Sequence, residues 1–195
     1  MQKSAITNVQ KIKVGWKPAA KFRIPIPKNE KARLDSLRNC MVLDTPPEDH
    51  FNDITVLASY ICETPIALIS LVDSDRQWFK SKVGILKSET PRDIAFCAHA
   101  IMQKDVFVVP DATLDPRFKN NPLVVSDPKI RFYAGATLLT SQHHALGTLC
   151  VADYVPRSLS QQQLAALKLL SRQVVALLEL RQQCIKLKSQ TEQKT

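Results

Sequence analysis

The chain has 195 residues, of which 45% are hydrophobic, and a formal net charge of +9, which suits one sizeable domain with tails. No stretch approaches the roughly 20 apolar residues that span a bilayer. The apolar segment of a signal peptide does not follow the basic N-terminus, so we expect a cytoplasmic protein. Five cysteines without CxxC spacing argue against a disulfide framework and a zinc site. We expect neither a metal nor a cofactor.

The positive charge is concentrated at the two ends of the chain. Residues 1–33 hold nine Lys or Arg and one acid, whereas residues 34–180 are close to neutral. Residues 1–29 show no helical or strand period, which predicts a disordered or extended arm. Such an arm is either a solvated tail or a segment that binds an acidic protein, with nucleic acid and membrane surfaces less favoured. Its candidate contact residues are Trp16, Lys17, Lys21, Phe22, Arg23, Ile24 and Ile26.

Hydrophobic periodicity predicts an α+β domain after the arm. Two helices are expected first, one over 30–39 and one from about 45 to 63. Residues 66–72 are apolar on both alternating faces, which predicts a central strand covered on both sides. Further strands are expected in the later part of the domain, over 76–81, 107–109, 131–140 and 145–153. Together they predict one sheet between two covering layers.

The stretch that begins at Thr90 predicts a helix on the border of a pocket. Thr90 is a typical N-cap residue, and Pro91 fits the first helical position. On such a helix Arg92, Phe96 and His99 share one side, which is free to face a ligand or a covering loop.

The covering loop is expected over residues 110–128, which contain four prolines and no clear period. A connection of that length inside a domain is usually a lid or a binding loop. The candidate pocket residues are Arg92, Phe96, Cys97, His99, Asp111, Asp115, Arg117, Phe118, Asn121, Arg131 and Tyr133. For Asp111, Asp115 and Asn121 the alternative is stabilisation of their own turns. For Arg117 and Arg131 two alternatives remain open: ion pairing across the pocket mouth, and an anion site for a ligand.

The last helix is expected to begin after Ser160 and to run past Ile185, with a polar tail over 182–195. Its apolar stripe is wider than one packed face requires, which predicts a parallel homodimer about a two-fold axis. The candidate dimer residues are Leu167, Leu170, Val174, Leu177 and Leu178.

Several short motifs follow one another in a recognisable order. They are Pro65 to Asp73, Arg76 to Ser81, Thr90 to Arg92, Phe96 to Ile101, Asp111, Asp115 to Phe118, Asn121 to Val124, Ile130 to Ala136 and Leu146 to Asp153. Together they resemble a GAF domain of the bacterial type found beside histidine kinases and diguanylate cyclases. The resemblance implies a PAS-like central antiparallel sheet flanked by N- and C-terminal helices. It divides the chain into an arm (1–29), a GAF domain (30–181) and a tail (182–195).

The resemblance leaves the function open, because GAF domains bind many ligands or none. Some GAF proteins are similar to free methionine-(R)-sulfoxide reductases. If this chain were such an enzyme, Cys97 would be its nucleophile. Only Cys150 lies near it in the pocket region, and the lid, where that family carries cysteines, has none.

Two further ligand classes of the family fit the sequence poorly. Bilin-binding GAF domains attach the pigment through a cysteine usually followed directly by histidine, whereas one residue separates Cys97 from His99. The signature of cyclic-nucleotide GAF domains is not found in order. We therefore expect a non-catalytic sensory or interaction module whose output is binding, either of a protein partner through the arm or of a small ligand under the lid.

Overall fold

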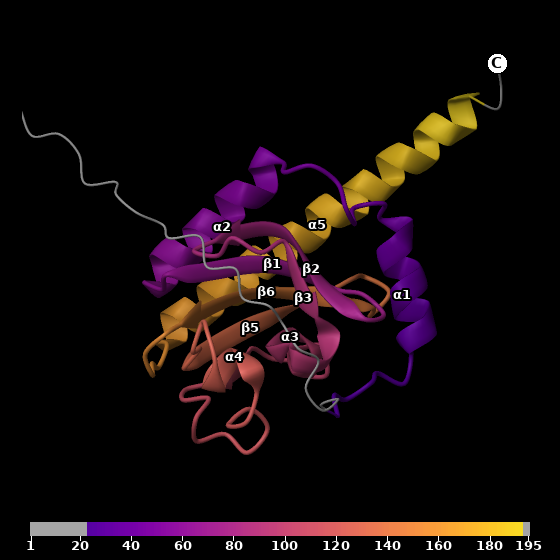
Figure 1. Ribbon diagram of the computed structural model, residues 1–195. Coiled ribbons are helices and arrows are strands. Elements are labelled where there is room, and N and C mark those ends of the chain that lie inside the picture. Colours follow the sequence, from indigo (N-terminus) through magenta and orange to yellow (C-terminus); the bar gives the residue numbers. More distant parts are fainter. Residues whose placement is uncertain (1–22, 193–195) are drawn as a thin grey trace, which may run out of the picture.

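The structure, a computed structural model, describes residues 23–192 and contains an antiparallel sheet with helices on both sides (Figure 1). The six strands follow the order β3-β2-β1-β6-β5-β4. The strands are β1 (Ile66–Val72), β2 (Arg76–Val83), β3 (Glu89–Pro91), β4 (Phe107–Val109), β5 (Phe132–Leu139) and β6 (Ala145–Asp153). The helices are α1 (Glu30–Asn39), α2 (Asp49–Cys62), η1 (Arg92–Ile94), α3 (Phe96–Ala100), α4 (Pro122–Val125) and α5 (Gln161–Glu192). The predicted α+β class is confirmed.

Strand β1 is an inner strand whose two faces belong to different cores. Ile69 and Leu71 join the cluster beneath α2 and α5, whereas Ile66 and Val72 join the cluster beneath α3 and the lid. This division follows from the alternation of side chains along a strand. The expectation that helices and lid cover opposite faces is confirmed for α2 and α5, whereas α1 packs at one end of β6.

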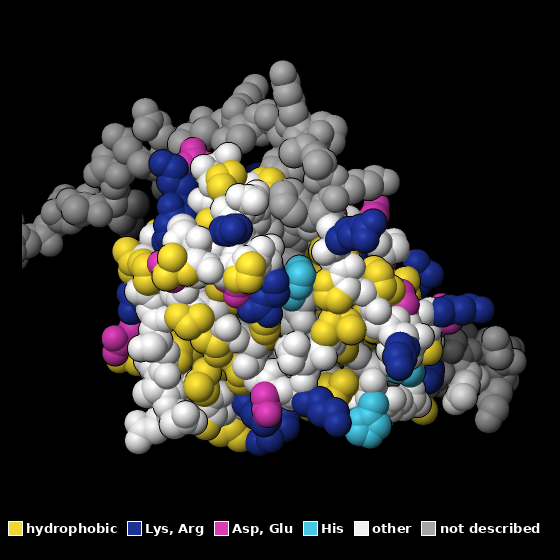
Figure 2. Space-filling view, turned by 90° about the horizontal axis from the view of Figure 1, so that it is seen from below, with side chains coloured by type: hydrophobic (Ala, Val, Ile, Leu, Met, Phe, Trp, Pro, Cys, Tyr) yellow, Lys and Arg dark blue, Asp and Glu magenta, His cyan; other side chains and the backbone are white. Residues whose placement is uncertain are grey.

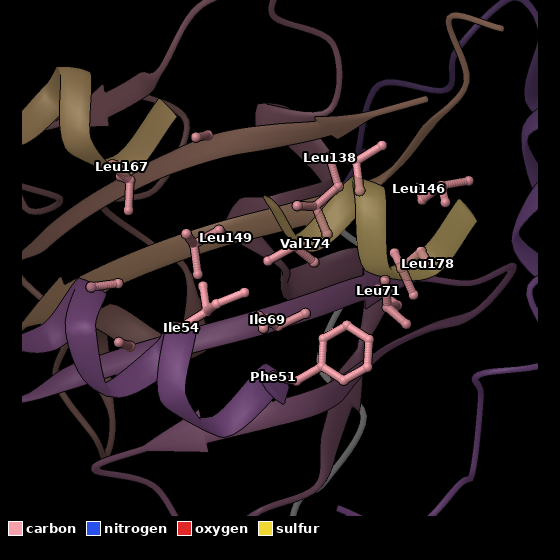
Figure 3. Close-up of a cluster of buried hydrophobic side chains, with 14 of the residues drawn as sticks. Phe51, Ile54, Ile69, Leu71, Leu138, Leu146, Leu149, Leu167, Val174 and Leu178 are labelled. Carbon is pink, nitrogen blue, oxygen red and sulfur yellow. The ribbon is translucent and has the colours of Figure 1, made fainter. Parts of the chain in front are cut away.

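The larger core lies between the sheet and the two long helices (Figure 3). Helix α2 packs mainly on β1 and β2, and α5 packs mainly on β5 and β6. The side chains that meet there include Phe51 and Ile54 from α2 and Leu138, Leu146 and Leu149 from the sheet. Burial of such side chains stabilises the domain by about 1.5–3 kcal/mol each before the entropy of ordering is subtracted.

The residues predicted to form a dimer face belong instead to this core. Leu167, Val174 and Leu178 are fully buried, and Leu170 and Leu177 are partly buried against the same cluster. Leu167, Val174 and Leu178 are therefore not available to a second copy, whereas Leu170 and Leu177 keep part of their surface exposed. The width of the stripe that suggested a dimer arises because α5 packs on both the sheet and α2.

The observed bounds of α5 can be compared with the predicted start after Ser160 and the predicted end beyond Ile185. Ser160 caps the helix, since its hydroxyl accepts a bond from the Gln163 backbone N–H at 3.2 Å, and the Gln163 side chain accepts one from the Ser160 N–H at 2.9 Å. At the other end α5 continues past Ile185, as predicted, and reaches Glu192, so residues 182–192 of the polar tail are helical.

The segment around Thr90 also differs from the prediction. Thr90 and Pro91 lie in strand β3, where they pair with Gln77 and Arg76, and the α-helix begins only at Phe96. The Thr90 hydroxyl accepts a bond from the Gln77 side chain at 2.6 Å and so does not cap a helix. The pairing with β2 explains the difference, because it holds Thr90 and Pro91 in extended geometry.

Candidate ligand pocket

A cavity of about 400 Å³ lies on the lid side of the sheet. Its lining comes from the sheet, from the connection between β2 and β3, and from the end of the lid around residues 123–130. Most of the wall is apolar and includes Leu68, Phe79, Ile85, Leu123 and Ile130. The size and character fit small-ligand sites, which span roughly 300–1,000 Å³ and carry a few placed polar groups.

The cavity opens between the β2–β3 connection and the end of the lid. Lys87 from the connection and Asp127 from the lid both line it, and both are exposed. Gly84 brings the connection close to the sheet: it has φ +79°, and a Cβ there would lie 2.0 Å from the Pro65 carbonyl oxygen. Figure 2 views the molecule from below, the side of the lid and α4 in Figure 1, and shows hydrophobic side chains at the surface among several basic ones.

A network of polar side chains crosses the inner wall of the cavity. The Ser70 hydroxyl donates to the Gln77 side-chain oxygen at 3.1 Å, and the Gln77 amide donates to Thr90. The Tyr133 hydroxyl donates to the Cys97 sulfur at 3.3 Å and lies 3.4 Å from the Thr148 hydroxyl. The sulfurs of Cys97 and Cys150 are 3.9 Å apart. Buried polar groups need such partners, because an unpaired one costs about 1–3 kcal/mol.

The buried groups of this network differ in the direction in which their pKa is shifted. Burial alone would raise the pKa of the Cys97 thiol, but hydrogen bonds from four neighbours outweigh it and lower that pKa to about 6. The four neighbours are Cys150, Ser70, Thr148 and Tyr133. The pKa of Cys150 lies well above its ordinary value because of the hydrogen bond with Cys97 and burial, and burial raises that of Tyr133. The geometry also distinguishes the two sulfurs, because the Tyr133 hydroxyl donates to that of Cys97.

Of the predicted pocket residues, Phe96, Cys97 and Tyr133 line the cavity. Phe118 lies one layer behind, with its ring stacked on Phe96 at a centroid distance of 4.1 Å. His99 lies on the far side of Phe118, at 4.9 Å between ring centroids, where burial and then Arg117 lower its pKa.

The charged residues predicted for the pocket hold other parts of the structure together. Arg117 pairs with Asp115 at 2.5 Å and covers the Phe118 ring at 5.4 Å. Asp111 accepts bonds from Thr113 in its own turn. The Asn121 side chain caps α4 and donates to the Ile94 carbonyl, and Arg131 donates to backbone carbonyls that include that of Val124. These residues fit the turn and ion-pair alternatives.

Arg92 points away from the cavity and towards α1. It pairs with Glu30 at 2.6 Å and donates to the Asp73 carbonyl at 2.9 Å. Arg33 also pairs with Glu30, at 2.7 Å, and is itself fully buried. Two arginines therefore share one carboxylate where α1 meets the sheet. Arg33 gave no sign of burial in the sequence, because a basic residue on a short helix next to a basic arm predicts exposure.

Further cavity residues were missed, and several of them come from the sheet. Leu68 and Gln77 face the cavity from β1 and β2, and Ala152 faces it from β6. The two-sided apolar pattern of 66–72 contained the signal: one face packs under the helices, so the alternate positions had to meet something else.

The predicted contact residues of the arm lie mostly outside the described part of the chain. Trp16, Lys17, Lys21 and Phe22 are in that outer segment, and nothing structural bears on them. Of the others, Arg23 and Ile26 are exposed and Ile24 is half-buried. Among residues 23–192, no cluster of three or more potential metal ligands occurs, and no helix is long and apolar enough to cross a membrane.

A single antiparallel sheet, with α2 and α5 on one face and a lidded cavity on the other, defines the α+β class to which the GAF fold belongs. The family model for the GAF domain matches residues 37–178, and the chain belongs to the GAF domain family. It is 44% identical over 153 residues to a cyclic di-GMP phosphodiesterase of Pseudomonas aeruginosa. That match covers 78% of this chain but only 26% of the relative.

Solved structures share the fold at low sequence identity. The GAF domain of a phosphoenolpyruvate-protein phosphotransferase from Acinetobacter has a TM-score of 0.57 and 15% identity, over 76% of this chain and 93% of that one. The free methionine-R-sulfoxide reductase of Neisseria meningitidis has a TM-score of 0.57 and 15% identity, over 84% and 98%. The chromophore-binding domain of a bacteriophytochrome from R. palustris has a TM-score of 0.57 and 11% identity, over 82% and 65%.

Proposed function

We propose that this chain is a non-catalytic sensory module that binds a small, largely apolar ligand under the lid and passes its occupancy to α5. The observation that carries the proposal is the position of β6. Cys150 and Ala152 line the cavity from one face of this strand, and Leu149 and Val151 pack in the core beneath α5 from the other. Because the two faces of β6 contact the cavity and the core beneath α5, a ligand that displaces β6 would also displace the helix.

The ligand class follows from the wall of the cavity. An apolar body gains about 25 cal/mol for each Å² removed from water. A single polar end suits the Gln77 amide or the Tyr133 hydroxyl, which lie among otherwise apolar side chains. The likeness to part of a cyclic di-GMP phosphodiesterase supports a role in a signalling system, in which the module acts on another catalytic unit.

A fluorescent apolar probe tests this proposal. Titration of the purified protein with 1-anilinonaphthalene-8-sulfonate is expected to give saturable binding, with about one probe per chain. Leu68→Trp fills the cavity and is expected to weaken binding about tenfold, which corresponds to about 1.4 kcal/mol. Leu114→Trp is the matched control, because this lid residue is 79% exposed and does not line the cavity. Equal binding by both variants would contradict a ligand site in the cavity.

Helix α5 also carries a feature that supports pairing with a second copy. A row of exposed side chains recurs at alternating spacings of four and three residues, as at the seam of a coiled coil. The row consists of Leu169, Gln173, Ala176, Leu180, Gln183 and Leu187. Because these residues face away from the domain core, they replace the buried set predicted from the sequence. Two parallel copies of α5 would then share one output.

The basic arm supports a third part of the proposal, a protein partner. Residues 1–33 carry most of the net charge of the chain, so attraction to an acidic surface falls to them. At physiological ionic strength that attraction fades over about 8 Å. Contact must therefore be close, and the apolar arm residues would supply its selectivity.

A further inference from the structure

We propose that Cys97 and Cys150 form a modification site, a dithiol that an apolar organic hydroperoxide entering the cavity oxidises to a disulfide. The proposal rests on the proposed ligand cavity and concerns the regulation of the same site. It starts from the position of two sulfurs that come from different elements, α3 and β6, and lie 3.9 Å apart. Both cysteines line the cavity, although each is otherwise almost completely buried.

The surroundings of Cys97 favour a reactive thiolate. The Tyr133 hydroxyl donates to its sulfur at 3.3 Å, and the Thr148 hydroxyl lies 3.4 Å from that of Tyr133. Thiolates, and not thiols, attack peroxides, and donors of this kind stabilise a thiolate. The lowered pKa of Cys97 agrees with this geometry.

The same chain contains matched thiols in a different setting. Cys40 and Cys62 are as buried as Cys97 but lie in the opposite core, beneath the helices. Burial is the leading cause that raises the pKa of each to about 11. The Cys40 sulfur donates to the Ser36 carbonyl at 3.4 Å, as expected of a structural thiol. They do not line the cavity, so its contents should oxidise neither of them.

The reaction balances with the hydroperoxide as the oxidant. The Cys97 thiolate attacks the outer oxygen of ROOH, the O–O bond breaks, and the alkoxide takes a proton to leave as ROH. Cys97 is now a sulfenic acid. The Cys150 sulfur attacks the Cys97 sulfur, the S–O bond breaks, and the hydroxide leaves as water with the Cys150 proton. Two thiols are oxidised to one disulfide, and one hydroperoxide is reduced to an alcohol and water.

The walls select the class of oxidant. A hydroperoxide with an aromatic or alkyl body gains affinity from burial against Leu68, Phe79 and Ile130. Hydrogen peroxide lacks such a body and is expected to react more slowly at equal concentration. Disulfide formation must bring the sulfurs from 3.9 Å to about 2 Å. It therefore pulls α3 towards β6, the strand that contacts α5.

The test oxidises the reduced full-length chain, with Cys184→Ser to remove the exposed thiol. Cumene hydroperoxide and hydrogen peroxide are compared by alkylation and peptide mass mapping. We expect a Cys97–Cys150 linked peptide, formed at least about tenfold faster than any oxidation of Cys40 or Cys62. Cumene hydroperoxide is expected to be the faster oxidant. In Cys150→Ser, which removes the second thiol, dimedone should trap a sulfenic acid on Cys97.

Several results would overturn the proposal. It fails if Cys97 and Cys150 remain thiols while the protein binds the fluorescent probe, and the ligand proposal then survives alone. It fails equally if all buried cysteines oxidise at one rate, because that pattern indicates unfolding. Rapid disulfide formation with both peroxides, without probe binding, would keep the dithiol but reject the apolar selectivity and the ligand site. If Cys150→Ser does not fold, the wild-type mapping alone decides.

Discussion

The substitution Glu30→Gln tests how α1 is attached to the domain. The Glu30 carboxylate accepts bonds from Arg33 at 2.7 Å and from Arg92 at 2.6 Å. Arg33 is 0% exposed and Arg92 is 3% exposed, so both guanidinium groups depend on partners inside the protein. A glutamine keeps the shape and one acceptor oxygen but removes the negative charge from between them.

The size of the effect follows from the burial of the arginines. Removal of one partner from a buried ion pair costs about 3–5 kcal/mol, because the remaining charge is uncompensated. The Glu30 side chain is 20% exposed, so water offsets part of the loss, and we expect about 3 kcal/mol at pH 7. For a domain of this size the melting temperature should fall by roughly 6–12 °C.

The effect should depend on pH in a defined direction. Burial alone would raise the pKa of Glu30, but bonds and charge from Arg33 and Arg92 outweigh it and lower that pKa to about 2, from 4.5. A carboxylate with a lowered pKa stabilises the fold fully above its unfolded pKa, and the contribution is lost as the pH falls through the folded pKa. The difference between wild type and Glu30→Gln should therefore be largest above pH 4.5 and shrink towards pH 2.

Urea denaturation at several pH values measures this difference. Asp44→Asn is the matched control, because Asp44 pairs with Arg76 but is 61% exposed, and exposed pairs contribute only about 0–1 kcal/mol. Asn also tolerates the φ of +60° at that position. The reasoning is refuted if both variants lose equal stability, or if the loss in Glu30→Gln is the same at pH 3 as at pH 7.

Three further predictions concern the sheet, the output helix and the arm. Gly147→Ala places a Cβ 2.0 Å from a carbonyl oxygen of β1 and should lower the free energy of unfolding by about 3 kcal/mol. An unchanged urea midpoint would show that β1 and β6 can move apart without loss of stability. Leu180→Glu with Leu187→Glu should convert a two-fold dimer into a monomer in sedimentation, and a wild-type monomer at tens of micromolar would exclude the pairing. Trp16→Ala with Phe22→Ala should weaken capture of an acidic partner more than loss of two arm lysines, since each covered side chain contributes about 1.5–3 kcal/mol. If the lysines matter more, charge alone holds the partner.

The sequence predicted the sheet well because its pattern is local. The alternating apolar faces of 66–72 placed β1 inside the sheet, and 107–109 and 145–153 match the observed β4 and β6. The helix expected at Thr90 failed because cap-like residues compete with strand pairing, and the partner strand lies more than ten residues away. The local helix propensity of residues 90 and 91 does not reveal a contact with a strand that is distant in sequence.

The pocket was harder to predict, because its members are defined by distant partners. Phe96, Cys97 and Tyr133 were identified and line the cavity, whereas Arg92 is drawn away by Glu30, 62 residues earlier in the chain. The dimer prediction failed at Leu167, Val174 and Leu178 for a related reason, since a wide apolar stripe does not reveal how many elements of its own chain will cover it. Residues such as Gln77 gave no signal on their own.

The length of α5 beyond the core would make this helix a lever for the output proposed above. Leu178 is the last fully buried residue of the helix, and the stretch from there to Glu192 extends about 21 Å at 1.5 Å per residue. Figure 1 shows this stretch projecting past the sheet. A tilt of about 10° where the helix rests on β5 and β6 would move its far end by about 4 Å. A small displacement of the sheet that tilts α5 would thus become a larger displacement at the far end of the helix.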